Sequence, residues 1–129
     1  MPIEVKILGF AALLQYVQFI LMAIPVNLQL GTAYTAGPRD EQKTAKGMAG
    51  RLKRAMENHF EALVLFAIAV VVVVLSESSS GLTQSCAWVY LAARIAYVPA
   101  YASGVYLLRS VVWAVGFLAT FFMLIAAMF

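Results

Sequence analysis

Long uninterrupted runs of apolar residues alternate with short polar segments along this chain. The apolar runs predict four helices, over residues 5–30, 50–75, 82–102 and 108–129. Each can reach the roughly 20 residues that a helix needs to cross a bilayer, with flanking Lys and Arg side chains extending to the interface. A transmembrane barrel would instead show short strands of alternating polarity. We therefore expect an all-α integral membrane protein, folded as a four-helix bundle.

The composition agrees with a membrane location. Of 129 residues, 64% are hydrophobic and only 12% are charged, which is far from the average soluble domain. The length fits a single unit, so we assign residues 1–129 to one membrane domain. No cluster of positive charge precedes the first apolar run, so we expect a retained first helix and not a cleaved signal peptide.

The basic residues are distributed unevenly, which predicts an orientation. The turn at residues 76–81 carries none, whereas the region between the first two predicted helices carries Arg39, Lys43, Lys46, Arg51, Lys53 and Arg54. By the positive-inside rule the first and third loops are cytoplasmic and both termini lie outside. The same basic residues could instead draw an anionic ligand toward the protein.

Polar residues interrupt the beginning of the second apolar run. Asn58 and Glu61 lie four and seven residues after Arg54, a spacing that places all three on one helix face. An ionisable residue inside a bilayer costs roughly 2.5 to 3.5 kcal/mol, so it normally faces a partner, a cavity or a substrate. This face is the first candidate for function.

A second polar face follows in the third predicted helix. Tyr97 and Tyr101 lie three and seven residues after Arg94, and the fourth helix opens with Arg109 and Ser110. These residues and those of the second helix are all near the cytoplasmic ends, so a bundle would bring them to similar depth. Arginines, phenols, an amide and a carboxylate would suit a small anionic ligand that also carries an amine.

Two interpretations of these polar residues remain open. The first is a ligand pocket, in which the positive charge of Arg109, near a phenol or Ser110, would favour the ionised form of a bound thiol. The second is a structural network, in which Glu61 pairs with an arginine and Asn58 bridges two helices.

Other kinds of site are not expected. His59 is the only histidine and points roughly 140° away from the Arg54 face, so a metal site is not predicted. Cys86 is the single cysteine, cannot form an intrachain disulfide, and is expected to pack as a small hydrophobe. No phosphate-binding glycine loop, no Ser-His-Asp set and no nucleic-acid patch is present in the sequence.

Three ordered motifs carry a resemblance to a known family. They are Arg54-x-x-x-Asn58-x-x-Glu61, Arg94-x-x-Tyr97-x-x-x-Tyr101, and Arg109-Ser110. In this order and spacing they resemble the MAPEG family, the membrane-associated proteins in eicosanoid and glutathione metabolism, which includes microsomal glutathione transferases. The resemblance implies a homotrimer of four-helix subunits that binds glutathione on the cytoplasmic side at subunit interfaces. A lipophilic substrate would reach the site from the bilayer.

The resemblance also implies roles for individual residues. The residues that would bind glutathione are Arg54, Asn58, Glu61, Arg94, Tyr97 and Tyr101. The residues that would act on the thiol are Arg109, Ser110 and Tyr101, with Arg109 stabilising the thiolate and Ser110 as the rival for that task. Well-studied eukaryotic members have a basic residue near the end of the first helix, where this chain offers only Asn27 or Gln29 as hydrogen-bond donors. Glu57 also places a second carboxylate one turn before Glu61.

The expected function is therefore a glutathione-dependent membrane enzyme that conjugates lipophilic electrophiles or reduces hydroperoxides. The short chain and compact first loop favour a member from a bacterial inner membrane. One alternative is a non-catalytic lipid-binding or scaffold protein on the same fold. Another is a small proton-coupled multidrug exporter, although a Glu61 carboxylate paired with Arg54 would be poorly placed to release protons.

Overall fold

The described part of the chain is built from helices. A computed structural model describes residues 1–37 and 46–129, so the basic residues Arg39 and Lys43 lie outside the described residues. Four long helices and one short helix follow one another: α1 (Ile3–Leu30), α2 (Thr32–Ala36), α3 (Gly47–Leu75), α4 (Gly81–Ala102) and α5 (Tyr106–Met128). Within these ranges no strand is present, which confirms the all-α prediction.

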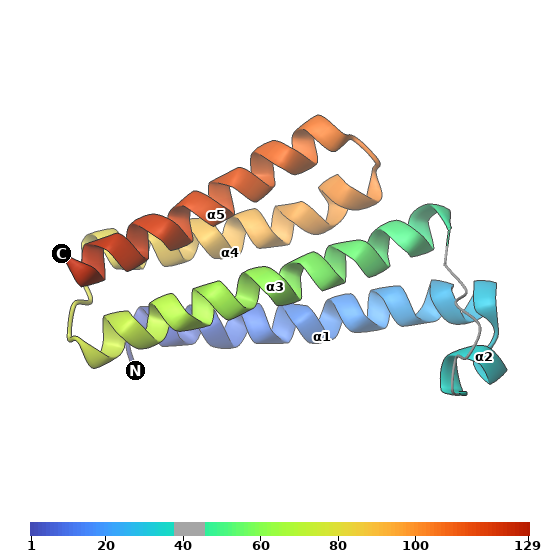
Figure 1. Ribbon diagram of the computed structural model, residues 1–129, viewed down its shortest axis with the longest axis horizontal. Helices are drawn as coiled ribbons and strands as arrows, with labels where there is room; N and C mark the ends of the chain where they lie inside the picture. Colours follow the sequence, from blue (N-terminus) through green and yellow to red (C-terminus); the bar gives the residue numbers. More distant parts are fainter. Residues whose placement is uncertain (38–45) are drawn as a thin grey trace.

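The long helices form two hairpins that lie against each other (Figure 1). α1 runs antiparallel to α3, and α4 runs antiparallel to α5. Both termini and the turn after α3 lie at one end of the molecule, whereas α2 and the α4–α5 loop lie at the other. Toward that second end the α4–α5 hairpin tilts away from α1 and α3.

Small and β-branched residues form the centre of the contact between the hairpins. Ala69, Val70 and Val73 of α3 are fully or almost fully buried, and small side chains of this kind let helices approach closely. Phe66 of α3 stacks on Tyr90 of α4 with ring centroids 3.9 Å apart. The stacked pair therefore joins the two hairpins near the middle of the core.

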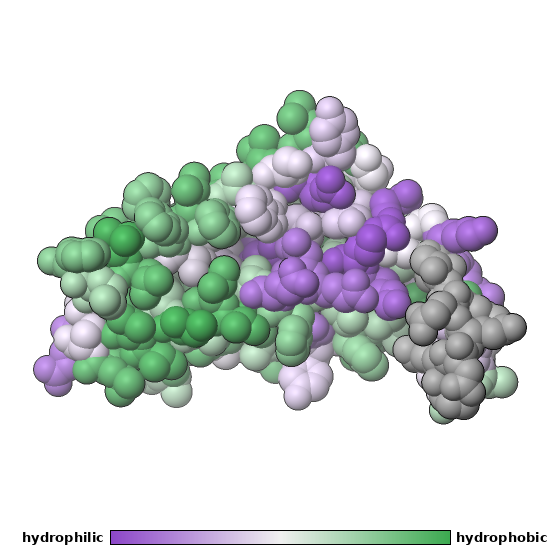
Figure 2. Space-filling model, viewed as in Figure 1, coloured by the Kyte–Doolittle hydropathy of each residue, from purple (hydrophilic) through white to green (hydrophobic). Residues whose placement is uncertain are grey.

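Three helices are long and apolar enough to cross a membrane: α1, α3 and α5. α4 does not meet that standard, because Arg94 and three tyrosines lower its hydropathy. Many large apolar side chains on the outer faces are exposed, including Phe19 of α1 and Phe122 of α5. In Figure 2 hydrophobic residues cover one half of the visible face, and hydrophilic residues gather where α3 begins and α4 ends. These features support a membrane protein with three candidate spans.

The end of α1 is tied to the elements that follow it. Gln29 makes two hydrogen bonds with the backbone of Lys46: its Nε2 donates to the carbonyl oxygen at 2.7 Å, and its Oε1 accepts from the amide at 2.8 Å. Asn27 donates to the carbonyl of Ala23 at 2.8 Å and accepts from the hydroxyl of Thr35 in α2. Both side chains thus serve the fold, and their expected role as ligand contacts is not supported within the subunit.

Two local features characterise the end of α1 and the segment after it. Pro25 lies inside α1 without interrupting it, since the helix continues to Leu30; the proline nitrogen lacks only one hydrogen bond of the helical ladder. The short helix α2 was not expected, because Gly, Thr and Pro in this segment are typical of a surface turn. It begins directly after Gly31, which ends α1 and whose φ of 85° is in the region that glycine adopts without strain.

A buried carboxylate joins the two hairpins at the opposite end. Glu4 is fully buried and accepts hydrogen bonds from the hydroxyls of Ser79 at 2.8 Å and Thr83 at 2.7 Å. Ser80 and Thr83 cap the first turn of α4 reciprocally. The start of α1 is therefore anchored to the start of α4, and the carboxylate sits where the N-terminal dipole of α1 favours negative charge.

Candidate functional site

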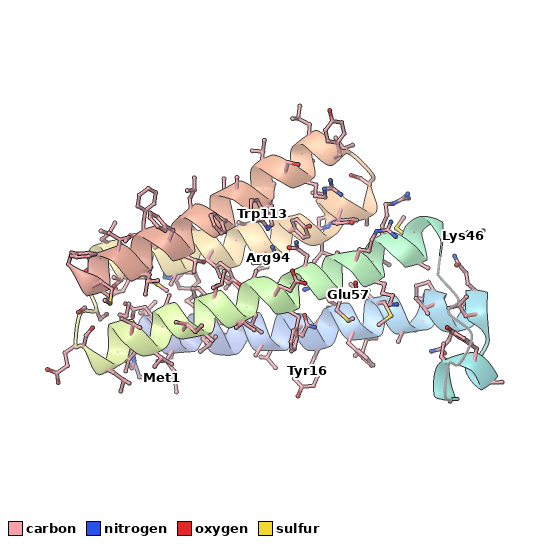
Figure 3. All side chains as sticks on the ribbon, viewed as in Figure 1. Met1, Tyr16, Lys46, Glu57, Arg94 and Trp113 are labelled. Carbon is pink, nitrogen blue, oxygen red and sulfur yellow. The ribbon has the colours of Figure 1, made fainter. Side chains whose placement is uncertain are left out.

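Three adjoining hollows lie between α3, α4 and α5, on the side where the hairpins diverge. The first, about 250 Å³, is next to the α4–α5 loop and is lined by Arg51, Arg54, Tyr101, Tyr106 and Arg109, among others. The second, about 260 Å³, is lined by Asn58, Tyr97, Tyr101, Arg109, Ser110 and Trp113. The third, about 380 Å³, is lined mainly by apolar side chains and shares Asn58 and Trp113 with the second. Figure 3 shows Arg94 and Trp113 near the middle of the helices' length.

Tyr101 is the meeting point of the first two hollows. The Nε of Arg54 on α3 donates to its hydroxyl at 3.1 Å, and the guanidinium of Arg109 on α5 lies 4.8 Å from the centre of its ring. The ring of Tyr97 meets it edge-on, with centroids 5.6 Å apart. Predicted site residues from three helices therefore converge here, with Ser110 on the wall of the second hollow.

The arginines of the first hollow have no carboxylate partner in the part of the chain that the structure describes. Arg51 donates from its Nε to the carbonyl of Ala102 at 2.9 Å, and Arg54 donates to the phenol of Tyr101. The ion pair found between described residues joins Lys53 and Glu57, at 3.8 Å, on an exposed face of α3. Uncompensated guanidinium groups in a concave site attract anions.

Asn58 and Arg94 link α3 to α4 behind the second hollow. Arg94 is only 2% exposed; its Nη1 donates to the Oδ1 of Asn58 at 3.0 Å, and its guanidinium lies 4.3 Å from the centre of the Tyr97 ring. The structural-network interpretation is thus partly confirmed, since Asn58 does bridge two helices. Asn58 nevertheless lines two of the hollows.

The third hollow is apolar but has polar groups along one wall. Its apolar lining includes Leu65, Trp113, Phe117 and Phe121, and its polar lining includes Glu61 and Arg94. Two buried polar atoms of its lining residues, the Nη2 of Arg94 and the hydroxyl of Tyr90, have no hydrogen-bond partner among the described residues. Most buried polar groups in proteins have a hydrogen-bond partner, so these two atoms are exceptions within the described structure.

Glu61 lies on the wall of the third hollow and is exposed in the subunit. Among the described residues nothing forms an ion pair with it, so the pairing of Glu61 with an arginine that the structural-network interpretation expected is not found there. Among the described residues, Glu61 therefore lacks the arginine partner that would have made it poorly placed to release protons in an exporter. The free carboxylate is equally suited to receive an ammonium group of a ligand.

The structure adds residues that the sequence analysis did not assign to the site. Arg51 and Tyr106 line the first hollow, and His59 is fully buried beside Arg94. His59 shares the buried face of α3 with Ala55 and Phe66, which lie four residues before and seven residues after it. The sequence signal that could have identified His59 is its position as a polar residue on a helix face that is otherwise apolar.

Comparison with known proteins identifies one relation. The model of a family described as the MAPEG family matches residues 7–129, nearly the whole chain. No curated protein and no solved structure matches the chain.

Proposed function

The chain belongs to the MAPEG family, and from this premise we propose that it is a glutathione-dependent membrane enzyme. In the proposed activity it transfers glutathione to lipophilic electrophiles or uses it to reduce lipid hydroperoxides. The assembly we propose is a homotrimer of four-helix membrane bundles in a bacterial inner membrane, with α4 as the fourth span. The first and third loops would face the cytoplasm and both termini the outside.

The observation that carries this proposal is a row of unpaired charged groups leading into an apolar hollow. Among residues 1–37 and 46–129, the three guanidinium groups of the first two hollows have only neutral partners, and the Glu61 carboxylate of the third hollow has no ion-pair partner. Glutathione has two carboxylates, one ammonium group and one thiol, so its charges complement this row. The volumes of the adjoining hollows, about 250 and 260 Å³, together reach the range of roughly 300 to 1,000 Å³ that small-molecule sites occupy.

We assign the residues to roles along this row. The residues proposed to bind the tripeptide are Arg54, Asn58, Glu61, Arg94, Tyr97 and Tyr101. The Nη2 of Arg94 is the free donor of an otherwise engaged guanidinium, and it suits a carboxylate oxygen. Glu61 suits the ammonium group, because no described cation neutralises it.

The chemistry proposed for the site begins with a thiol beside a cation. Glutathione supplies that thiol, whose ionised form is the reactive nucleophile. Arg109 lies over the ring of Tyr101, where its positive charge would stabilise a thiolate. The hydroxyl of Tyr101 accepts from Arg54, so its own proton remains free to donate to the sulfur. Ser110, on the wall of the second hollow, is the rival donor.

The products depend on the second substrate. With an electrophilic carbon, the sulfur would form a bond to that carbon as the leaving group departs with its electron pair. With a hydroperoxide, two glutathione molecules would be oxidised to their disulfide while the peroxide is reduced to an alcohol and water. The apolar third hollow, which adjoins the second through Asn58 and Trp113, suits the lipophilic part of either substrate.

The proposal is tested by activity of the purified protein. We expect conjugation of a chlorinated dinitrobenzene, reduction of a lipid hydroperoxide, or both, in the presence of glutathione. Replacing Arg109 by Ala should reduce turnover by roughly 100-fold, the scale of losing a group that stabilises developing charge, while the trimer stays intact on size-exclusion chromatography. Absence of both activities, together with no glutathione binding by calorimetry, would contradict the proposal.

A non-catalytic lipid-binding protein is the alternative with a specific observation in its favour. The third hollow is the largest of the three and its walls are mainly aromatic and aliphatic. On this alternative, lipid would bind without glutathione, and Arg109→Ala would disrupt the trimer instead of turnover. An exporter would require proton-driven efflux from proteoliposomes that Glu61→Gln abolishes.

A further inference from the structure

A buried histidine connects the proposed glutathione site to the opposite hairpin. His59 is fully buried and is not among the residues that line the three hollows. It lies between Arg94 of α4 and the backbone of Ala11 in α1. Its Nδ1 is within hydrogen-bond distance of Arg94, and its Nε2 is within hydrogen-bond distance of the Ala11 carbonyl oxygen. One side chain on α3 therefore bridges the two helices that flank it.

The partners determine which ring nitrogen carries the proton. The Nε of Arg94 lies 3.3 Å from the Nδ1 of His59, and a guanidinium nitrogen only donates, so Nδ1 must accept. The Nε2 lies 2.9 Å from the carbonyl oxygen of Ala11, which only accepts, so Nε2 must donate. His59 is thus held as the neutral tautomer protonated on Nε2, and the charged group facing it is Arg94.

This pair of bonds fixes how Arg94 presents its remaining nitrogens. With Nε held by His59, Nη1 donates to Asn58 at 3.0 Å, and the plane of the guanidinium lies over the ring of Tyr97. The Nη2 is left without a partner among the described residues. The Oδ1 of Asn58 accepts from Arg94, so its amide NH₂ is the group that can donate beside the second and third hollows.

We propose that His59 is a positioning residue for ligand binding, an inference that rests on the proposed glutathione site. The hydrogen bond to the α1 backbone holds the His59 ring in place, the ring holds the Nε of Arg94, and Arg94 in turn holds Asn58. In this preformed arrangement, the Nη2 of Arg94 and the amide of Asn58 face the anionic part of the ligand. Without the Nδ1 of His59 as acceptor, the guanidinium of Arg94 can adopt several orientations. The ligand must restrict it again, and affinity falls because that ordering has an entropic cost.

Three variants test this role. His59→Leu removes both hydrogen bonds. His59→Gln keeps one carbonyl oxygen to accept from Arg94 and one NH₂ to donate to Ala11. Gln18→Leu is the matched control, because Gln18 is equally buried at 2% exposure and its amide has no partner among the described residues.

The expected result is a selective loss of glutathione affinity in His59→Leu. Its Kd by calorimetry and its KM for glutathione should both rise roughly tenfold, which corresponds to about 1.4 kcal/mol, while kcat stays within about twofold because Arg109 is unaltered. His59→Gln should restore most of the affinity, and Gln18→Leu should match the wild type. In an Arg94→Leu background, His59→Leu should have no further effect on Kd.

Three results would overturn the inference. The first is wild-type affinity in His59→Leu; the second is an equal loss in His59→Gln and His59→Leu. The third, which needs no variant to fold, is nitrogen NMR of the labelled wild-type trimer that shows His59 protonated on Nδ1. Failure of the proposed function is distinguishable from these, since the wild type itself would then not bind glutathione.

Discussion

The side chain of Tyr101 makes two separate contacts in the candidate site. Its hydroxyl accepts from Arg54 on one side, at 3.1 Å, and its ring lies under the guanidinium of Arg109 on the other, at 4.8 Å. The first contact needs the oxygen and the second needs only the ring face. Substitutions can therefore remove one contact while keeping the other.

We expect Tyr101→Phe to raise the KM for glutathione about fivefold. The change removes the hydrogen bond to Arg54, and a bond of this kind contributes about 1 kcal/mol when it is partly exposed. Both variants lose the hydroxyl that is proposed to donate to the sulfur, so kcat should fall in both. Tyr101→Ala also removes the ring beneath Arg109, so its kcat should fall further. Steady-state kinetics of both variants measure this difference, and equal kcat values in the two would show that the ring does not help to position Arg109.

The free carboxylate of Glu61 leads to a second prediction at this scale. Glu61→Gln should weaken glutathione binding roughly tenfold, because the amide cannot compensate the ammonium charge. The unfolding temperature should remain unchanged, since Glu61 is exposed and no described residue forms an ion pair with it. Glu57→Gln is the control, because Glu57 lies on the same helix but pairs with Lys53. A lower unfolding temperature without loss of affinity would assign Glu61 a structural role.

The sequence predicted the shared face of Asn58 and Glu61 because helical spacing alone determines it, and both residues line the third hollow. It also predicted that Arg54 and Arg109 come close, and both contact Tyr101. The contact between His59 and Arg94 was not predictable from spacing. It depends on how α3 is rotated against α4, which the packing of the whole core decides.

At the scale of elements, Glu4 links two helices that are distant in the sequence. Its carboxylate receives hydroxyl protons from Ser79 and Thr83 and is fully buried. If the carboxylate were removed, the buried hydroxyl of Thr83 would lose its 2.7 Å acceptor and keep only the carbonyl of Ser80 at 3.1 Å. Loss of a partner by a buried polar group costs roughly 1 to 3 kcal/mol. The link thus stabilises the end of the molecule away from the proposed site.

Replacing Glu4 by Ala should lower the unfolding temperature in detergent without changing the KM for glutathione. Glu4→Gln keeps an acceptor oxygen and should lie between the wild type and the alanine variant. Glu77→Gln is the matched control, because Glu77 is exposed in the neighbouring turn. An unchanged unfolding temperature in Glu4→Ala would show that the carboxylate contributes no net stability.

The number and approximate ends of the long helices were predictable from the lengths of the apolar runs. The predicted ranges 5–30, 50–75, 82–102 and 108–129 agree with α1, α3, α4 and α5 to within three residues at each end. The short α2 was missed because a single helical turn has no hydrophobic period. The sequence also predicted a span over residues 82–102, but α4 is not among the three candidate spans, because Arg94 and three tyrosines lower its hydropathy.

At the scale of the whole molecule, a cationic region and an apolar region adjoin, because neighbouring hollows share lining residues. Hydrophobic residues dominate the half of the visible face near the termini, and hydrophilic residues gather on the other half (Figure 2). The three hollows cross this boundary, from the arginines near the α4–α5 loop to the aromatic wall of α5. In the proposed activity, the water-soluble thiol and the lipid-soluble substrate meet at this boundary.

The central claim, that converging guanidinium groups bind and ionise the thiol of glutathione, is tested most directly by difference spectroscopy of the thiolate. Glutathione added to the purified protein, at a pH where the free thiol is protonated, should produce ultraviolet absorbance of the thiolate that saturates with concentration. An analogue with a methyl group in place of the thiol should bind without this signal, and Arg109→Ala should bind glutathione while losing most of it. No thiolate signal in the wild type, or an equal signal in Arg109→Ala, would contradict the account.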